Sequence, residues 1–150
     1  MASYTSTQSG NWSNNATWGG SGHPVSGDDA TIATGHNITV DVNSVVGDDS
    51  TNVVLTSNGN STITIASGVT LTVRGELAVA TGSLTLSKNC ILEWGSTAGN
   101  TSFRQTAADY TIQCAGGGNA PSSGNRATIR KRSGAVAVLM SPYYRCAYDL

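Results

Sequence analysis

The carboxylates are the side chains of this sequence that could catalyse a reaction. Asp28 and Asp29 are neighbours in one turn, and Asp48 and Asp49 are neighbours in another. Cleavage of a glycoside needs two carboxyl groups at a set separation across a cleft. In a Gly-Asp-Asp turn, however, an Asp side chain more often hydrogen-bonds to its own backbone. We therefore expect carboxylates that form turns, no catalytic residue, and a protein that is not an enzyme.

The two histidines form a weak pattern for a metal site. His23 and His36 could meet Asp28 or Asp41 if the first turn packs against the second strand. They lack helical spacing and a cysteine partner, so they do not make a zinc signature. The Asp-rich turns could instead supply oxygen ligands for Ca²⁺. Hydrogen-bonded loops explain the same residues, and we predict no metal site and no cofactor.

The basic residues cluster near the end of the chain, where residues 101–150 are net basic and residues 1–100 net acidic. This cluster has four basic side chains and no aromatic residues between them, which is weak evidence for a nucleic-acid site. We therefore do not expect nucleic acid as a partner. An ion pair between subunits is one alternative, and an ordinary solvated strand is another. The tyrosines beyond the cluster could seat the end of the chain or a neighbouring subunit. The residues predicted for subunit contact are Arg126, Arg130, Arg132, Tyr143 and Tyr144.

The cysteines and the first residues bear on where the protein works. Cys90, Cys114 and Cys146 are odd in number and widely spaced, so we expect buried thiols rather than disulfides or zinc ligands. The opening MASYTSTQSG has neither the basic nor the apolar region of a secretory signal, and no apolar run is long enough for a membrane span. This combination suggests assembly in a host cytoplasm and later use in a virion. A fragment of a secreted, cell-surface protein would look the same.

The composition favours an all-β fold. Ser, Thr and Asn are abundant beside 18 Gly, and charged residues make up only 11%. These residues disfavour helix interiors, whereas the β-branched residues fall in short runs that suit strands. Most of the runs alternate apolar with polar residues. The predicted strands are residues 29–32, 37–42, 52–56, 61–66, 69–73, 76–80, 83–87 and 90–94.

A period of seven residues indicates how these strands are arranged. Gly68, Gly75, Gly82 and then Asn89 each precede a five-residue strand. Gly and Asn are the residues that tolerate a positive φ. We predict a short, single-stranded, right-handed parallel β-helix, with a β-sandwich or jelly roll as the alternative. The predicted core is Ile63, Ile65, Leu71, Val73, Leu77, Val79, Leu84, Leu86 and Leu92, with Ser and Thr outside.

The tryptophans are predicted to close one end of this solenoid. Stacked coils leave an exposed end that needs a cap. Trp12 and Trp18 lie in a polar, loop-like stretch and can cover that end. We expect a polar arm over residues 1–10 and a β-helix domain over 11–150, regular at about 29–95 and less regular over 96–150. Trp12, Trp18 and Trp94 are the alternative candidates for contact with a ligand.

The stretch from residue 11 to residue 42 carries a resemblance to known proteins. NWSNNATW, GG, HPVSGDDATI and TGHNITVDV follow one another in this order. The order resembles the start of G8-type domains and of related bacterial and phage β-helix proteins, over about residues 10–95. The resemblance implies extracellular attachment or carbohydrate contact, or a role in tail fibres, tailspikes or head decoration. Residues 96–150 depart from the pattern.

These observations lead to two hypotheses about function. The first is a non-enzymatic structural protein of a bacteriophage virion, in the capsid decoration or a tail appendage, which forms a homotrimer and docks onto other virion proteins. The second is a carbohydrate-binding or adhesion module of a larger surface protein. In that case a tryptophan ring would stack on host surface polysaccharide.

Overall fold

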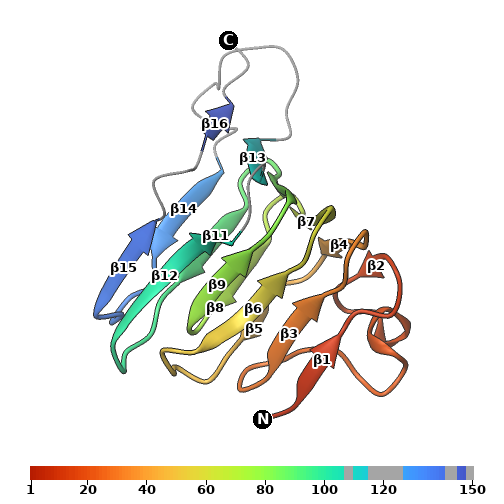
Figure 1. Ribbon diagram of the computed structural model, residues 1–150, viewed down its shortest axis with the longest axis horizontal. Helices are drawn as coiled ribbons and strands as arrows, with labels where there is room; N and C mark the ends of the chain where they lie inside the picture. Colours follow the sequence, from red (N-terminus) through yellow and green to blue (C-terminus); the bar gives the residue numbers. More distant parts are fainter. Residues whose placement is uncertain (107–109, 115–126, 141–144, 148–150) are drawn as a thin grey trace.

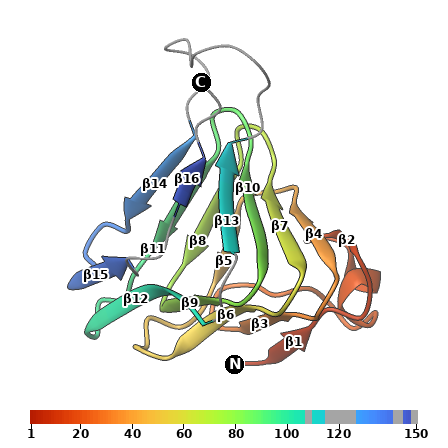
Figure 2. The same ribbon diagram turned by 45° about the horizontal axis from the view of Figure 1, so that its top comes forward.

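The computed structural model is a parallel β-helix whose coils stack along one axis (Figure 1). It describes residues 1–106, 110–114, 127–140 and 145–147. Three parallel sheets form the sides of the solenoid, which Figure 2 shows in a triangular arrangement. Every strand pairing among the described residues is parallel and joins one coil to the next. This is the pattern of the predicted β-helix and not of a β-sandwich or jelly roll, whose strands pair antiparallel.

Each full coil contributes one strand to each sheet. Sheet 1 contains β1 (Ser3–Thr5), β3 (Asp29–Ile32), β6 (Val53–Ser57), β9 (Glu76–Val79), β12 (Asn100–Gln105) and β15 (Ala137–Met140). Sheet 2 contains β2 (Gly10–Asn11), β4 (Asn37–Val40), β7 (Ser61–Ile65), β10 (Gly82–Leu86), β13 (Tyr110–Cys114) and β16 (Arg145–Ala147). Sheet 3 contains β5 (Ser44–Val46), β8 (Thr70–Val73), β11 (Ile91–Trp94) and β14 (Thr128–Lys131).

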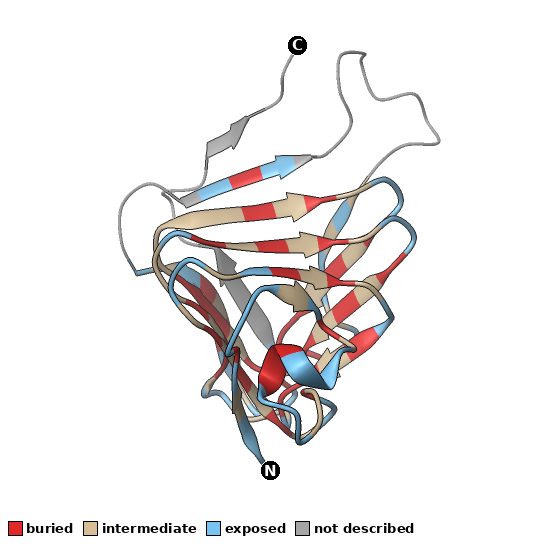
Figure 3. Cartoon of the chain, turned by 90° about the vertical axis from the view of Figure 1, so that its right-hand side faces the viewer, coloured by how far each residue is buried: buried red, intermediate tan, exposed pale blue. Residues whose placement is uncertain are grey.

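The core lies inside the three sheets, and the alternation of the sequence produces it. Successive residues of a strand point to opposite faces, so every second side chain points inward. Ile63 pairs with Leu84 and Leu84 with Ile112, which builds an apolar column along the axis. Figure 3 shows buried and half-buried positions alternating along the strands. All of the predicted core residues are buried, at no more than 2% exposed.

The seven-residue period corresponds to a coil of three strands and three bends. Gly68 (φ 73°) and Asn89 (φ 57°) occupy the same bend in successive coils, both in the left-handed region. Gly75 serves a different purpose, because a Cβ there would lie 2.7 Å from a Val54 methyl carbon. The period thus marks close approach of neighbouring coils as well as positive φ.

The first ten residues differ from the predicted arm. Ser3–Thr5 forms β1 and pairs with β3 in register, and Gly10 opens β2, which pairs with β4. The polarity of this segment suggested a solvated arm, but alternate residues of an outer strand need not be apolar when the strand lies at the end of a sheet. β1 and β2 therefore begin a first, incomplete coil, whose third side meets the next coil only at the Ser26–Gly47 bridge.

Candidate functional site

The tryptophans of the first coil lie in the core. A short 3-10 helix, η1 (Asn15–Trp18), begins after Asn14, whose side chain accepts a hydrogen bond from the Ala16 amide. Trp12 and Trp18 are 0% and 5% exposed, and their rings meet edge to face at 5.0 Å. Trp12 Nε1 donates to the Pro24 carbonyl at 3.1 Å, and Trp18 Nε1 donates to the Trp12 carbonyl at 2.8 Å. Burial and satisfied donors are what a cap needs.

Trp94 is buried in a different coil. It is 3% exposed and packs edge to face against Phe103, with ring centroids 5.6 Å apart. Stacking on a sugar requires an exposed ring face, and none of the three tryptophans presents one. The sequence therefore located three packing residues, of which Trp12 and Trp18 belong to the first coil.

The Asp residues of the first turns are held by hydrogen bonds, as the turn interpretation predicts. Asp28 accepts from the amides of Ala2 (2.7 Å) and Val25 (3.3 Å). Asp48 accepts from the Ser50 amide at 3.0 Å, and the hydrogen bonds from Ser50 lower its pKa. Burial raises the pKa of Asp29, and the negative charges of Asp48 and Asp28 add to that effect, while the N-terminal amino group opposes it.

The two histidines have separate partners. His36 Nδ1 lies 2.8 Å from the Ser6 hydroxyl, and His23 Nδ1 lies 3.2 Å from Asn15 Oδ1. Within the described ranges, no three His, Cys, Asp or Glu side chains are grouped so that they could hold a metal ion. In the same part of the chain, no helix is both long and apolar enough to cross a membrane.

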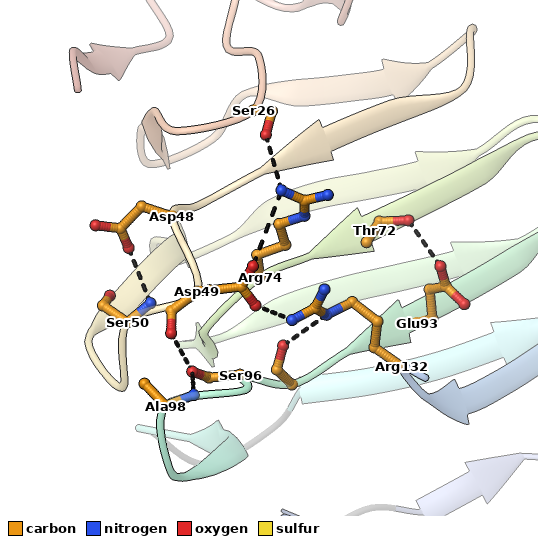
Figure 4. A network of polar contacts seen from close by, with 11 residues as sticks. Ser26, Asp48, Asp49, Ser50, Thr72, Arg74, Glu93, Ser96, Ala98 and Arg132 are labelled. Carbon is orange, nitrogen blue, oxygen red and sulfur yellow. Dashed lines mark hydrogen bonds and ion pairs between the residues drawn. The ribbon is translucent and has the colours of Figure 1, made fainter. Parts of the chain in front are cut away.

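Asp49 is the centre of an axial ion-pair column that crosses the coils where sheet 3 turns into sheet 1 (Figure 4). Its carboxylate pairs with Arg132 of the fourth full coil and lies 3.9 Å from Arg74 of the second. Arg74 Nη1 also donates to the Ser26 hydroxyl at 3.2 Å, and Arg132 Nε donates to the Gly95 carbonyl at 3.0 Å. The column thus connects segments from Ser26 to Arg132.

Two further acids bind arginines on the outer faces of the sheets. Glu93 accepts from Thr72 at 2.9 Å and from Arg130 at 3.0 Å, along sheet 3. Glu76 pairs with Arg104 at 2.5 Å and accepts from the Ser102 hydroxyl, along sheet 1. The glutamates point outward, as their place in the alternation predicts.

The predicted subunit-contact residues fall into two groups. Arg130 and Arg132 pair with acids from earlier in the same chain, so the attraction between the acidic and basic parts acts within one subunit. Arg132 is only 13% exposed at its side chain, and Arg130 is 54% exposed. Arg126, Tyr143 and Tyr144 lie outside the described residues.

Sheet 2 differs from the other two sheets in its outer surface, which we call the threonine face. Over β4, β7, β10 and β13 its outward side chains are short, polar and uncharged. Two columns run along the axis in unbroken register. The first column is Asn37, Thr62, Ser83 and Thr111, and the second is Thr39, Thr64, Thr85 and Gln113.

Side chains of the threonine face also hydrogen-bond to one another along the columns. The Thr62 and Ser83 hydroxyls are 3.2 Å apart, and Gln113 Nε2 donates to the Thr85 hydroxyl at 2.9 Å. Sequence reasoning assigned these residues to the outer side but not to one surface. The signal was present as the Asn-Ile-Thr, Thr-Ile-Thr, Ser-Leu-Thr and Thr-Ile-Gln segments, once the register between coils is known.

Comparison with known proteins finds no matching family model, no similar curated protein and no similar solved structure. The resemblance to G8-type and phage β-helix proteins therefore stays a prediction made from the motifs of residues 11–42.

Proposed function

We propose that this chain is a non-enzymatic structural protein of a bacteriophage virion, used as capsid decoration or in a tail appendage. It would act by forming a homotrimer and docking onto other virion proteins. The proposal is supported by the solenoid architecture and by the motif order at residues 11–42, which resembles that of G8-type and phage β-helix proteins.

The use of the charged groups is the observation that carries this proposal. Five carboxylates accept hydrogen bonds from, or form ion pairs with, groups of the same chain: Asp28, Asp41, Asp49, Glu76 and Glu93. A hydrolytic pair needs one carboxyl that can release or take up a proton opposite another, in reach of a substrate. Groups committed to joining coil to coil favour a mechanical role over a chemical one.

The first test of self-assembly is the mass of the purified protein by light scattering over a range of concentrations. We expect a species of three times 15.3 kDa. A folded monomer at every concentration would contradict the homotrimer and remove the support for an assembled appendage.

A pair of arginines allows the subunit contact to be tested at one position. Arg130 binds Glu93 of its own chain, but its side chain is still 54% exposed and it belongs to the predicted contact set, so Arg130→Ala should lower the trimer fraction. Arg104→Ala is the matched control, since Arg104 is 51% exposed, against 54% for Arg130, and pairs with a strand glutamate in the same way. Equal trimer fractions in both variants and the parent protein would exclude Arg130 as a subunit contact.

A further inference from the structure

The threonine face is regular in register and its eight side chains are uncharged, and these properties restrict what can bind to it. Each of its eight side chains is half-buried or exposed, while the residues between them, such as Ile63 and Leu84, are at most 1% exposed. Thr side chains have few χ1 rotamers. The packed core below fixes the backbone of the face, so the five threonines among its eight residues hold their hydroxyl and methyl groups in few orientations.

The spacing of the face follows from the geometry of a parallel sheet. Neighbouring strands are about 4.8 Å apart, and side chains two residues apart along a strand are about 6.6 Å apart. A register shift occurs between β6 and β9 of sheet 1, whereas the pairings from β4 to β13 proceed without one. The face is thus a nearly rectangular lattice, two columns wide.

Crystalline water has almost the same spacing. With tetrahedral hydrogen bonds of about 2.75 Å between oxygens, second-neighbour oxygens lie about 4.5 Å apart, and the axial repeat of hexagonal ice is about 7.3 Å. Over the three intervals of a column the mismatch grows to about 1 Å, and over the single interval between columns it is about 0.7 Å. Because the face has only two columns of four residues, the difference between its spacings and those of ice stays below half the oxygen–oxygen distance of a hydrogen bond.

Other partners fit the face less well. The eight side chains carry no charge, and Arg145, which pairs with Thr111 at the end of the first column, adds a single positive charge, too few to hold a nucleic acid. Stable protein interfaces bury about 800 Å² on each partner and use aromatic or arginine anchors. Four strands of four or five residues cover only about 300 Å² by the strand spacings, and the eight side chains include no such anchor.

We propose that the threonine face binds ice, and that water held on its two columns joins the lattice of the crystal. This activity is independent of the virion role. Protein molecules bound to the surface make ice grow as curved fronts between them, which lowers the freezing point below the melting point.

The test is the gap between freezing and melting temperatures, together with the incorporation of the protein into a slowly growing ice hemisphere. The parent protein should show a gap and enter the ice. Thr64→Tyr should reduce both several-fold, because the ring stands above the face while tyrosine remains a good strand residue. Thr85→Tyr, one coil along, has the same expected result and covers the case in which one variant does not fold.

Thr56→Tyr is the matched control. Thr56 is a half-buried outward threonine on β6, on sheet 1, where Glu76 and Arg104 form an ion pair. It should leave ice binding unchanged, and circular dichroism should show the same fold in all variants. The proposal is overturned if the parent protein is excluded from ice, or if Thr56→Tyr reduces binding as much as Thr64→Tyr. It is also overturned if the face binds a neutral polysaccharide, with the same sensitivity to Thr64→Tyr, and not ice.

Discussion

Replacing Trp12 tests whether the tryptophans cap the solenoid. Trp12 is fully buried, and truncation of a buried Trp to Ala costs about 3–5 kcal/mol. Its Nε1 also donates to the Pro24 carbonyl, and loss of that buried hydrogen bond adds about 1 kcal/mol. We therefore expect Trp12→Ala to cost about 4–6 kcal/mol, a large share of the roughly 8–20 kcal/mol expected for a chain of this length.

The cost should fall on one end of the molecule. In a solenoid each coil contacts mainly its neighbours, so a destabilised end can unravel while the remaining coils stay folded. After Trp12→Ala, amide hydrogen exchange should therefore lose protection in β1 to β4 and retain it in β7 to β11. Urea unfolding should show an added early transition. Trp12→Phe, which keeps a ring but no donor for Pro24, should cost less than half as much.

Two results would refute the capping argument. The first is a cost of Trp12→Ala below about 1 kcal/mol, which is too small for a buried aromatic residue. The second is an equal loss of protection in all coils, which would mean that Trp12 supports the whole core rather than its first coil.

Three substitutions of acids, with one arginine substitution for comparison, test the electrostatic arguments by urea unfolding. Asp49→Asn should cost about 1–3 kcal/mol, because it leaves Arg132 partly buried without its partner, and Asn tolerates the φ of 70° at this position. Arg130→Gln, at an exposed ion pair, should change stability by less than about 1 kcal/mol. If Arg130→Gln and Asp49→Asn cost the same stability, the central place of Asp49 is contradicted. Asp29→Asn should stabilise the protein at neutral pH, because the pKa of Asp29 is raised in the folded state and its ionised form opposes folding. The gain in stability should vanish below the ordinary pKa of 3.8. A gain that persists at lower pH would contradict this cause. Partial burial acts to raise the pKa of Asp41, but the hydrogen bonds from Ser13 outweigh it and lower the pKa. The ionised Asp41 therefore stabilises the folded state above pH 3.8, and this stabilisation is lost as the pH falls through the lowered pKa. Asp41→Asn should therefore destabilise at neutral pH and make little difference in strong acid.

The fold could be predicted from the sequence because its signals are local. Alternation such as Thr-Ile-Thr-Ile at residues 62–65 determines which side chains point inward, and it depends on strand geometry alone. The turn residues at 68, 75, 82 and 89 give the coil of 21 residues that pairs Leu71 with Leu92. The buried Trp12 and Trp18 were also visible as a cap.

The partners of the charged and polar residues depended on the tertiary structure. The spacing between paired residues grows from 21 at Leu71–Leu92 to 37 at Leu92–Ile129, so local periodicity cannot give the register of the later coils. That register alone places Arg130 beside Glu93, and the path of the bends places Arg132 beside Asp49. The register between the first three full coils likewise stacks Thr39, Thr64 and Thr85 into one column. The sequence by itself therefore determined which residues face inward and how a coil is built, since those follow from neighbours along the chain. The tertiary structure decided which outward residues meet, because the contacts between coils join residues that loops of unequal length keep far apart in sequence.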